Sequence, residues 1–291
     1  MSLTRRQTAA ALLALPLALT ATPALAHGGG GPRGGGQRPR TLHLAGDSTA
    51  ARKYADAAPE TGWGMALPFF LGPHLDVANH AVNGRSSKSF VDEGRLTALL
   101  DGVRPGDLVL IQFGHNDEKT EDPARGTDPW TTYQQYLRLY LKGARERRAR
   151  PVLITPVERR RFADDGTARP THGQYPAAMR ALAAEERVPV LDAQALSLAR
   201  WQRLGPDGTQ PLFNWLEPDG TQPLFNWLEP GESPNYPDGR QDNTHFRPAG
   251  AVEVARMTAR ALLEARVLAP RDVRRLDAPV PEHLITWPQP V

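Results

Sequence analysis

Short, mostly apolar runs recur between residues 41 and 193. They are TLHLA (41–45), HLDVANHAV (74–82), GDLVLIQFG (106–114), PVLITPV (151–157) and VPVLDA (188–193). Continuous apolar runs, unlike alternating ones, are typical of strands that are buried on both faces of a parallel sheet. The pattern therefore predicts five parallel strands.

Helical periodicity separates these runs. In the segment 131–148, apolar and aromatic side chains recur at i, i+3, i+4, i+7, i+8 and i+11, and the segments 175–186 and 247–265 are also amphipathic. Alternation of strands and helices predicts a doubly wound α/β fold. In such folds, ligand sites form beyond the carboxyl ends of the strands.

The N-terminal segment has a different composition. Residues 1–26 contain Arg5-Arg6, then an apolar run, then Ala-Leu-Ala at 24–26, which together indicate a cleavable secretory leader. The paired arginines favour the twin-arginine export route. The apolar run is shorter than the roughly 20 residues that a membrane span needs. We therefore expect a secreted, extracellular protein.

The rest of the chain divides by composition. We interpret residues 27–38 as a glycine-rich linker, 39–278 as one α/β domain of ordinary size, and 279–291 as a C-terminal tail. Within the domain, PDGTQPLFNWLE occurs twice in tandem, over 206–229. Two copies are fewer than a solenoid needs, so we interpret the duplication as an insertion in a surface loop.

Charge and cysteine content narrow the function classes. The formal charge is +3, and removal of the leader with its two arginines would leave +1, which argues against a nucleic-acid-binding protein. The basic runs RERRAR (145–150) and ERRR (158–161) are interpreted as solvated surface, with attraction of an acidic polymer as the alternative. The chain has no cysteine, so the exported domain would fold without disulfides.

Three short motifs follow predicted strands and carry polar or glycine residues. Ser48 in AGDSTAA stands where a tight turn would expose its hydroxyl, although it could be a helix N-cap. Asn116 in GHND could donate its amide to an oxyanion or simply bond the local backbone. Gly84 in NGRSS could offer an unhindered N–H to a ligand or form an ordinary turn.

A fourth motif, DNTHF, lies near the end of the domain. Its Asp242 and His245 could form a surface turn, two metal ligands, or part of a catalytic device. A metal site would need further ligands at suitable spacing, and no His-x₃-His or cysteine set is present in the sequence. His115 and His172 are interpreted as loop or packing residues.

The order of these motifs resembles the SGNH hydrolases, also called the GDSL esterase family. Longer stretches are similar to rhamnogalacturonan acetylesterases: GDSTAA, GWG (62–64), NHAVNGRSSKSFVDEGR, GDLVLIQFGHNDE and DNTHFRPAGA. The resemblance implies a flavodoxin-like three-layer α/β/α sandwich with a five-stranded parallel sheet, and no metal or other cofactor. The tandem duplication departs from the family pattern, in which one such segment is expected.

The resemblance also implies roles for five residues. Ser48 would be the nucleophile, His245 the base and Asp242 the residue that orients it. The oxyanion hole would consist of the Ser48 and Gly84 N–H groups and the Asn116 amide.

The expected function is therefore a secreted serine esterase that removes acetyl groups from acetylated pectic rhamnogalacturonan. Its partner would be the acetylated polysaccharide, not nucleic acid or a membrane, and we interpret the protein as a monomer. The alternatives are a broader GDSL lipase or acyl esterase, an acetylxylan esterase, or a non-catalytic carbohydrate-binding pseudoenzyme. Four tryptophans could stack on sugar rings or pack in the core, namely Trp63, Trp130, Trp215 and Trp227.

Overall fold

The computed structural model describes residues 39–209 and 227–290. The predicted leader, the linker up to residue 38 and most of the duplicated segment lie outside the described residues. The described residues therefore do not test the predictions for these three segments.

A parallel sheet forms the centre of the described chain. Its strands are β1 (Arg40–Gly46), β2 (Leu75–Asn79), β3 (Leu108–Gln112), β4 (Arg150–Ile154) and β5 (Val190–Leu191). All are parallel, in the order β2-β1-β3-β4-β5, which is the flavodoxin-like order. The predicted five-stranded parallel sheet is confirmed, and each strand falls within or beside its apolar run.

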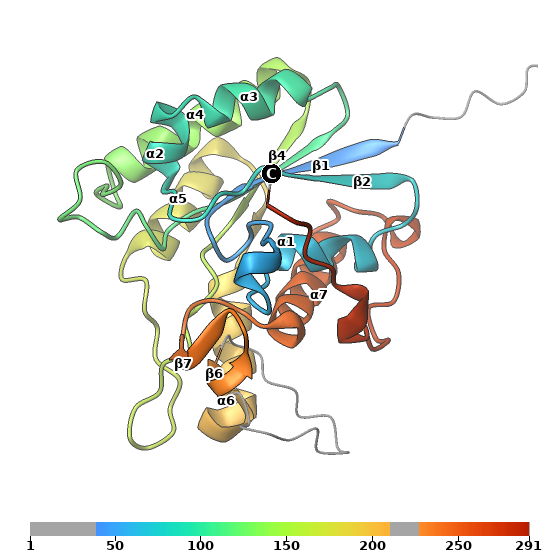
Figure 1. Ribbon diagram of the computed structural model, residues 1–291. Helices are drawn as coiled ribbons and strands as arrows, with labels where there is room; N and C mark the ends of the chain where they lie inside the picture. The colour runs from blue at the N-terminus through green and yellow to red at the C-terminus, as the bar shows by residue number, and fades with distance from the viewer. Residues whose placement is uncertain (1–38, 210–226, 291) are drawn as a thin grey trace, which may run out of the picture. The chain divides into compact units, whose positions relative to one another are not determined.

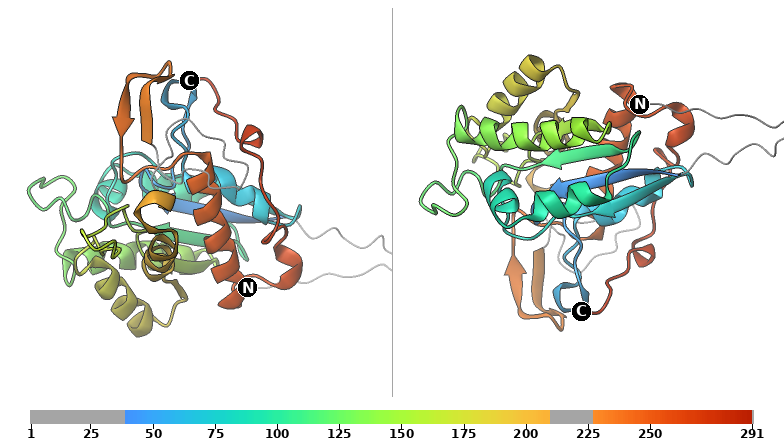
Figure 2. Two further views of the ribbon diagram at one scale, coloured as in Figure 1. Left: turned by 90° about the horizontal axis from the view of Figure 1, so that it is seen from below. Right: turned by 90° about the horizontal axis from the view of Figure 1, so that it is seen from above.

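Helices cover both faces of this sheet (Figures 1 and 2). They are α1 (Trp63–Ala66), α2 (Ser87–Asp92), α3 (Arg95–Gly102), α4 (Thr132–Glu146), α5 (Tyr175–Glu186), α6 (Ala193–Thr209, with a kink at Gly205) and α7 (Pro248–Glu264). The structure thus forms the expected three-layer α/β/α sandwich. The periodic segments correctly predicted α4, α5 and α7, whereas the other four helices were not predicted.

Two separate hydrophobic cores explain why the strands are apolar at successive positions. Leu108 and Leu110 of β3 pack in a core with α1, α6 and α7. Val109 and Ile111 point to the opposite core, which contains side chains of α2, α3, α4 and α5. Because both faces are covered, all five β3 residues are buried.

An antiparallel hairpin lies apart from the central sheet (Figure 1). It consists of β6 (Trp227–Ser233) and β7 (Tyr236–Gln241) and was not predicted from the sequence. The hairpin contacts the 3₁₀ turn Ala55–Ala57, where the Asn235 amide donates to the carbonyls of Ala55 and Ala58, both at 2.8 Å. Two segments that are distant in sequence are thereby held together.

The segment after residue 278, which the sequence suggested was a tail, also packs on the domain. Val280 and Ile285 are buried, and the Trp287 indole donates to the Glu60 carbonyl at 2.8 Å. Within residues 39–209 and 227–290, no helix is long and apolar enough to cross a lipid bilayer.

Candidate active site

Ser48 lies in a turn directly after β1. The buried Asp47 carboxylate fixes this turn by accepting hydrogen bonds from the Thr49 N–H at 2.9 Å and the Thr49 hydroxyl at 2.8 Å. It also contacts Nδ1 of His115 at 3.2 Å. Burial alone would raise the pKa of Asp47, but the charge and hydrogen bond of His115 and the Thr49 donors outweigh it and lower the pKa to about 2. A buried carboxylate therefore holds the backbone that presents Ser48.

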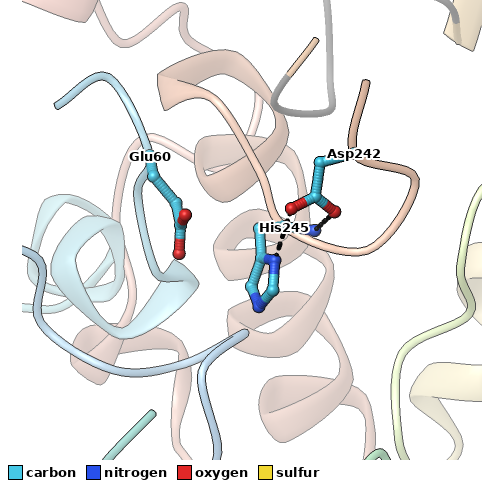
Figure 3. A group of neighbouring side chains, drawn as sticks. All are labelled: Glu60, Asp242 and His245. Carbon is cyan, nitrogen blue, oxygen red and sulfur yellow. Dashed lines mark hydrogen bonds and ion pairs between the residues drawn. The ribbon is translucent and has the colours of Figure 1, made fainter. Parts of the chain in front are cut away.

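The DNTHF motif brings two further side chains to Ser48. His245 Nε2 lies 2.8 Å from Ser48 Oγ, and His245 Nδ1 lies 2.7 Å from Asp242 Oδ2. Figure 3 shows Asp242 directed at the imidazole. The structure thus brings together the three residues for which catalytic roles were expected, although Ser48 and His245 are 197 positions apart.

Local backbone contacts hold Asp242 in place. Its second oxygen, Oδ1, accepts from the N–H groups of Thr244 at 2.8 Å and His245 at 3.0 Å, which closes the turn. Burial alone would raise the pKa of Asp242, but the hydrogen bond and charge of His245 and these N–H groups outweigh it and lower the pKa below its usual range. Asp242 is therefore ionised and oriented toward His245 Nδ1.

The expected oxyanion donors lie on the loops that follow three adjacent strands. Ser48 follows β1, Gly84 follows β2 and Asn116 follows β3. Gly84 has a φ of 75°, and a Cβ there would meet nothing within 4 Å, so the space beside its Cα is open. No described residue accepts a hydrogen bond from the N–H of Ser48 or Gly84. These N–H groups are thus available to a ligand.

Asn116 is tied to the loop that carries Gly84. Its side-chain amide donates to the Arg85 carbonyl at 3.1 Å, which leaves one amide hydrogen for another acceptor. The neighbouring Asp117 accepts from the Ser87 N–H at 3.1 Å and from the Ser87 hydroxyl. Burial raises the pKa of Asp117 to about 7 although the Ser87 donors oppose the shift. Asp117 was given no role from the sequence, yet it connects two of the three loops that carry the expected oxyanion donors.

A chain of charged residues continues from Asp242, and sequence reasoning missed it entirely. The Arg240 guanidinium donates to Asp242 Oδ2 at 2.8 Å, and its other terminal nitrogen lies 3.6 Å from Glu60. Glu60 is paired with the Lys53 ammonium at 2.6 Å, and Lys53 also donates to the Asn83 side chain at 2.7 Å. This chain runs from the triad to the residue that precedes Gly84.

Lys53 is the most deeply buried member of this chain, with 1% of its side chain exposed. Burial lowers the pKa of Lys53, and the charge and hydrogen bond of Glu60 oppose the shift. None of Lys53, Glu60 and Arg240 lies in one of the sequence motifs. Their closeness in sequence to AGDST, GWG and DNTHF was the only signal available.

Glu60, Asp242 and His245 also satisfy the geometry of a metal-ligand group, because their ligand atoms lie within 4.8 Å of one another (Figure 3). Glu60 and Asp242 are, however, already neutralised by Lys53 and Arg240. The ring nitrogens of His245 contact Asp242 and Ser48. The charge balance and the hydrogen bonds fit a triad with a supporting ion-pair chain better than they fit a cation site.

Two of the tryptophans considered for sugar stacking lie in contrasting environments. Trp63 is fully buried, and its indole donates to the Gln112 side chain at 2.5 Å, so it packs in the core. Trp130 is 46% exposed. Trp215 and the side chain of Trp227 lie outside the described residues.

The geometry agrees with the comparisons to known proteins. The chain matches the model of the GDSL-like lipase/acylhydrolase family over residues 44–251 and belongs to that family. It is 41% identical over 250 residues to the rhamnogalacturonan acetylesterase RhgT of Bacillus subtilis (strain 168), covering 86% of this chain and 96% of the relative. It is 40% identical over 223 residues to the probable rhamnogalacturonan acetylesterase YesY of the same strain, covering 77% and 92%.

Solved structures agree with the fold. The crystal structure of YxiM from Bacillus subtilis superimposes with a TM-score of 0.63 at 27% identity, over 78% of this chain and 57% of that one. The acetylxylan esterase Axe2 of Geobacillus stearothermophilus gives a TM-score of 0.51 at 17% identity, over 79% and 95%, a likeness of fold alone. The expected SGNH hydrolase fold and the resemblance to rhamnogalacturonan acetylesterases are confirmed. The protein is a carboxylic ester hydrolase, and its relatives support an acetylesterase.

Proposed function

We propose that the protein is a secreted serine esterase that removes acetyl groups from acetylated pectic rhamnogalacturonan. The observation that carries this proposal is the continuous hydrogen-bonded line from Ser48 through His245 to Asp242. The names of RhgT and YesY, both about 40% identical, supply the substrate class.

The first half of the reaction acetylates the enzyme. His245 Nε2 takes the proton of the Ser48 hydroxyl as Oγ attacks the carbonyl carbon of the acetyl ester. The negative charge that develops on the carbonyl oxygen is held by the N–H groups of Ser48 and Gly84 and by the Asn116 amide. When the tetrahedral intermediate collapses, the sugar oxygen leaves with the proton from His245.

The second half regenerates the serine. A water molecule gives its proton to His245 and attacks the acetyl-Ser48 carbonyl, and acetate leaves as Oγ regains the proton. Asp242 holds Nδ1 so that Nε2 faces Ser48, and it stabilises the imidazolium that forms in both halves.

Acetate release from three substrates tests the substrate assignment. We expect acetylated rhamnogalacturonan to be deacetylated faster than acetylated xylan, and long-chain acyl esters to be the poorest substrates. Ser48→Ala protein, purified in the same way, is the matched control for background hydrolysis. Equal or faster release from xylan would assign the protein to the acetylxylan esterases or the general esterases.

Export belongs to the same proposal. Its support is the leader pattern in residues 1–26, with Arg5-Arg6 and the final Ala-Leu-Ala. N-terminal sequencing of protein from the culture medium should give a start near His27. Extracellular protein that retains Met1 and the intact leader would contradict this part of the proposal.

A further inference from the structure

A hollow lies beside the Ser48–His245–Asp242 group, at the loop between β4 and α5. Its volume is about 660 Å³, within the range of about 300–1,000 Å³ typical of ligand pockets. The residues that line it include Arg159, Arg160, Arg161, Phe162, Thr171 and Asn243. We call it the arginine pocket. Asn243 stands between Asp242 and His245 in sequence, so the pocket adjoins the turn that carries both.

Two of its arginines are held by the protein. Arg159 pairs with Glu118. Arg160 is bound to the DNTHF turn twice, through its backbone N–H to the Asn243 carbonyl at 2.8 Å and its guanidinium to Asn243 Oδ1 at 3.2 Å. Its guanidinium carbon also lies 5.8 Å from the centre of the Phe162 ring. These contacts fix the pocket wall relative to the catalytic turn.

The third arginine is free to meet a ligand. Arg161 is exposed, and its guanidinium has no hydrogen-bond or ion-pair partner among the described residues. The acids that face the arginines are Glu118, which is paired with Arg159, and Asp207, whose charge acts on Arg160. The carboxylate of the neighbouring Glu158 is buried, and it accepts from Thr171 and Gln194. Arg161 is therefore the pocket arginine whose charge has no partner among the described residues.

We propose that the arginine pocket is a subsite that binds a carboxylate of an acidic polysaccharide, on a sugar unit near the acetylated one. The planar guanidinium matches a carboxylate through two parallel hydrogen bonds, and Phe162 offers an apolar surface to a sugar ring. The inference rests on the proposed function, because a galacturonan carries a carboxylate on its uronic acid units. It also gives the ERRR run a role beyond that of solvated surface.

Arg161→Gln is the test variant, because this side chain is exposed and contacts neither the triad nor its turn. We expect the KM for acetylated rhamnogalacturonan to rise about two- to fivefold, the range of an exposed ion pair. The kcat for that polymer and the kinetics with 4-nitrophenyl acetate and acetylated xylan should not change. High salt should reduce the difference between parent and variant, since it screens the carboxylate from Arg161.

Arg104→Gln provides the matched control. Arg104 is also exposed, but it precedes β3 and therefore lies at the end of the strands opposite the candidate site. This variant removes the same charge and should keep the parent KM on all three substrates. An Arg161→Gln variant with an unchanged KM for the acidic polymer, or with an equal rise for xylan, would overturn the subsite.

A competition experiment separates this inference from the proposed function. Unacetylated oligogalacturonate should inhibit 4-nitrophenyl acetate hydrolysis by the parent, and inhibit Arg161→Gln protein about two- to fivefold more weakly. If no acetate is released from rhamnogalacturonan but this difference persists, the subsite is supported and the proposed substrate is wrong. If acetate is released but inhibition is equal in both proteins, the substrate stands and the subsite is wrong.

Discussion

Two differently built parts of the molecule contribute to the same candidate site. The loops after β1 and β3 carry Ser48 and Asn116, and the β6–β7 hairpin carries Arg240. All five residues of β3 are buried, and the loop after it brings Asn116 and Asp117 to the site within five residues of the strand end. By contrast, no β7 residue from Tyr236 to Gln241 is fully buried. Arg240 of β7 reaches the site through its contacts with Asp242 and Glu60.

This difference separates the groups that are expected to meet the substrate from those that support them. A parallel strand with both faces covered cannot shift without exposing apolar surface, so it fixes the loop at its carboxyl end. A half-exposed strand such as β7 has no such constraint, and its position depends on individual side-chain contacts. We therefore expect substitutions in the loops after β1 and β3 to reduce catalysis more than substitutions in the hairpin.

The largest effect should come from the triad itself. Ser48→Ala and His245→Ala should each reduce kcat by about 10⁴-fold or more, and the double variant should be little worse than either, because the two residues act as a unit. Asp242→Asn should cost up to about 10⁴-fold. Steady-state hydrolysis of 4-nitrophenyl acetate, with and without chelator, measures all four variants. Retained activity in His245→Ala protein, or chelator sensitivity in the parent, would contradict the assigned roles.

The next effect tests the loop after β3. Asn116→Ala removes one of three expected oxyanion donors and should lower kcat by about 10²–10³-fold, with little change in KM, because the charge develops only in the transition state. Asn116→Asp is nearly isosteric and should be at least as harmful, since it places a carboxylate beside a developing anion. A change in KM alone would instead show that Asn116 binds the ground state.

The elements around the buried sheet could be predicted from the sequence, whereas the hairpin could not. Apolar runs located the five strands because both faces of the sheet are covered, and helical periodicity located α4, α5 and α7. The short helices α1 and α2 span only four and six residues, too few for a periodic pattern to emerge. The β7 sequence YPDGRQ contains Pro and Gly and reads as a loop.

The site shows why supporting residues are harder to predict than the residues expected to be catalytic. Ser48, Gly84, Asn116, Asp242 and His245 each lie in a short motif, and the structure places them on the loops where those motifs were expected. Lys53, Glu60 and Arg240 are recognised only through contacts across the fold, such as the 2.6 Å ion pair between Lys53 and Glu60. A single sequence contains no record of such pairs.

A smaller effect should follow from a change on the hairpin side. Arg240→Gln removes a charged donor to Asp242, but the Thr244 and His245 N–H groups still hold that carboxylate. We expect kcat to fall about tenfold, the size of one charge-assisted hydrogen bond at its lower end, while KM stays near the parent value. Arg240→Lys should recover part of the loss. An effect confined to KM would mean that Arg240 contacts substrate rather than orienting Asp242.

The smallest effect on catalysis should come from Asp117→Asn, which acts instead on the pH dependence of stability. The asparagine keeps an oxygen that can accept from Ser87 but removes a carboxyl whose pKa burial raises to about 7. A group with a pKa that is higher in the folded than in the unfolded protein contributes stability at low pH. That contribution is lost as the pH rises from about 4 to about 7.

Urea unfolding of parent and Asp117→Asn protein at several pH values isolates the contribution of Asp117 to stability. Asp47 and Asp242, whose pKa values are lowered, lose their stabilising contribution at acidic pH in both proteins, so they cancel in the difference. The free energy of unfolding of the variant, relative to the parent, should therefore rise between about pH 4 and pH 7 and level off above, by on the order of a few kcal/mol. A difference that stays constant across this range would show that Asp117 is ionised throughout. Its role at the Gly84 loop would then be that of a fixed acceptor, equivalent to the backbone contacts that hold Asp242.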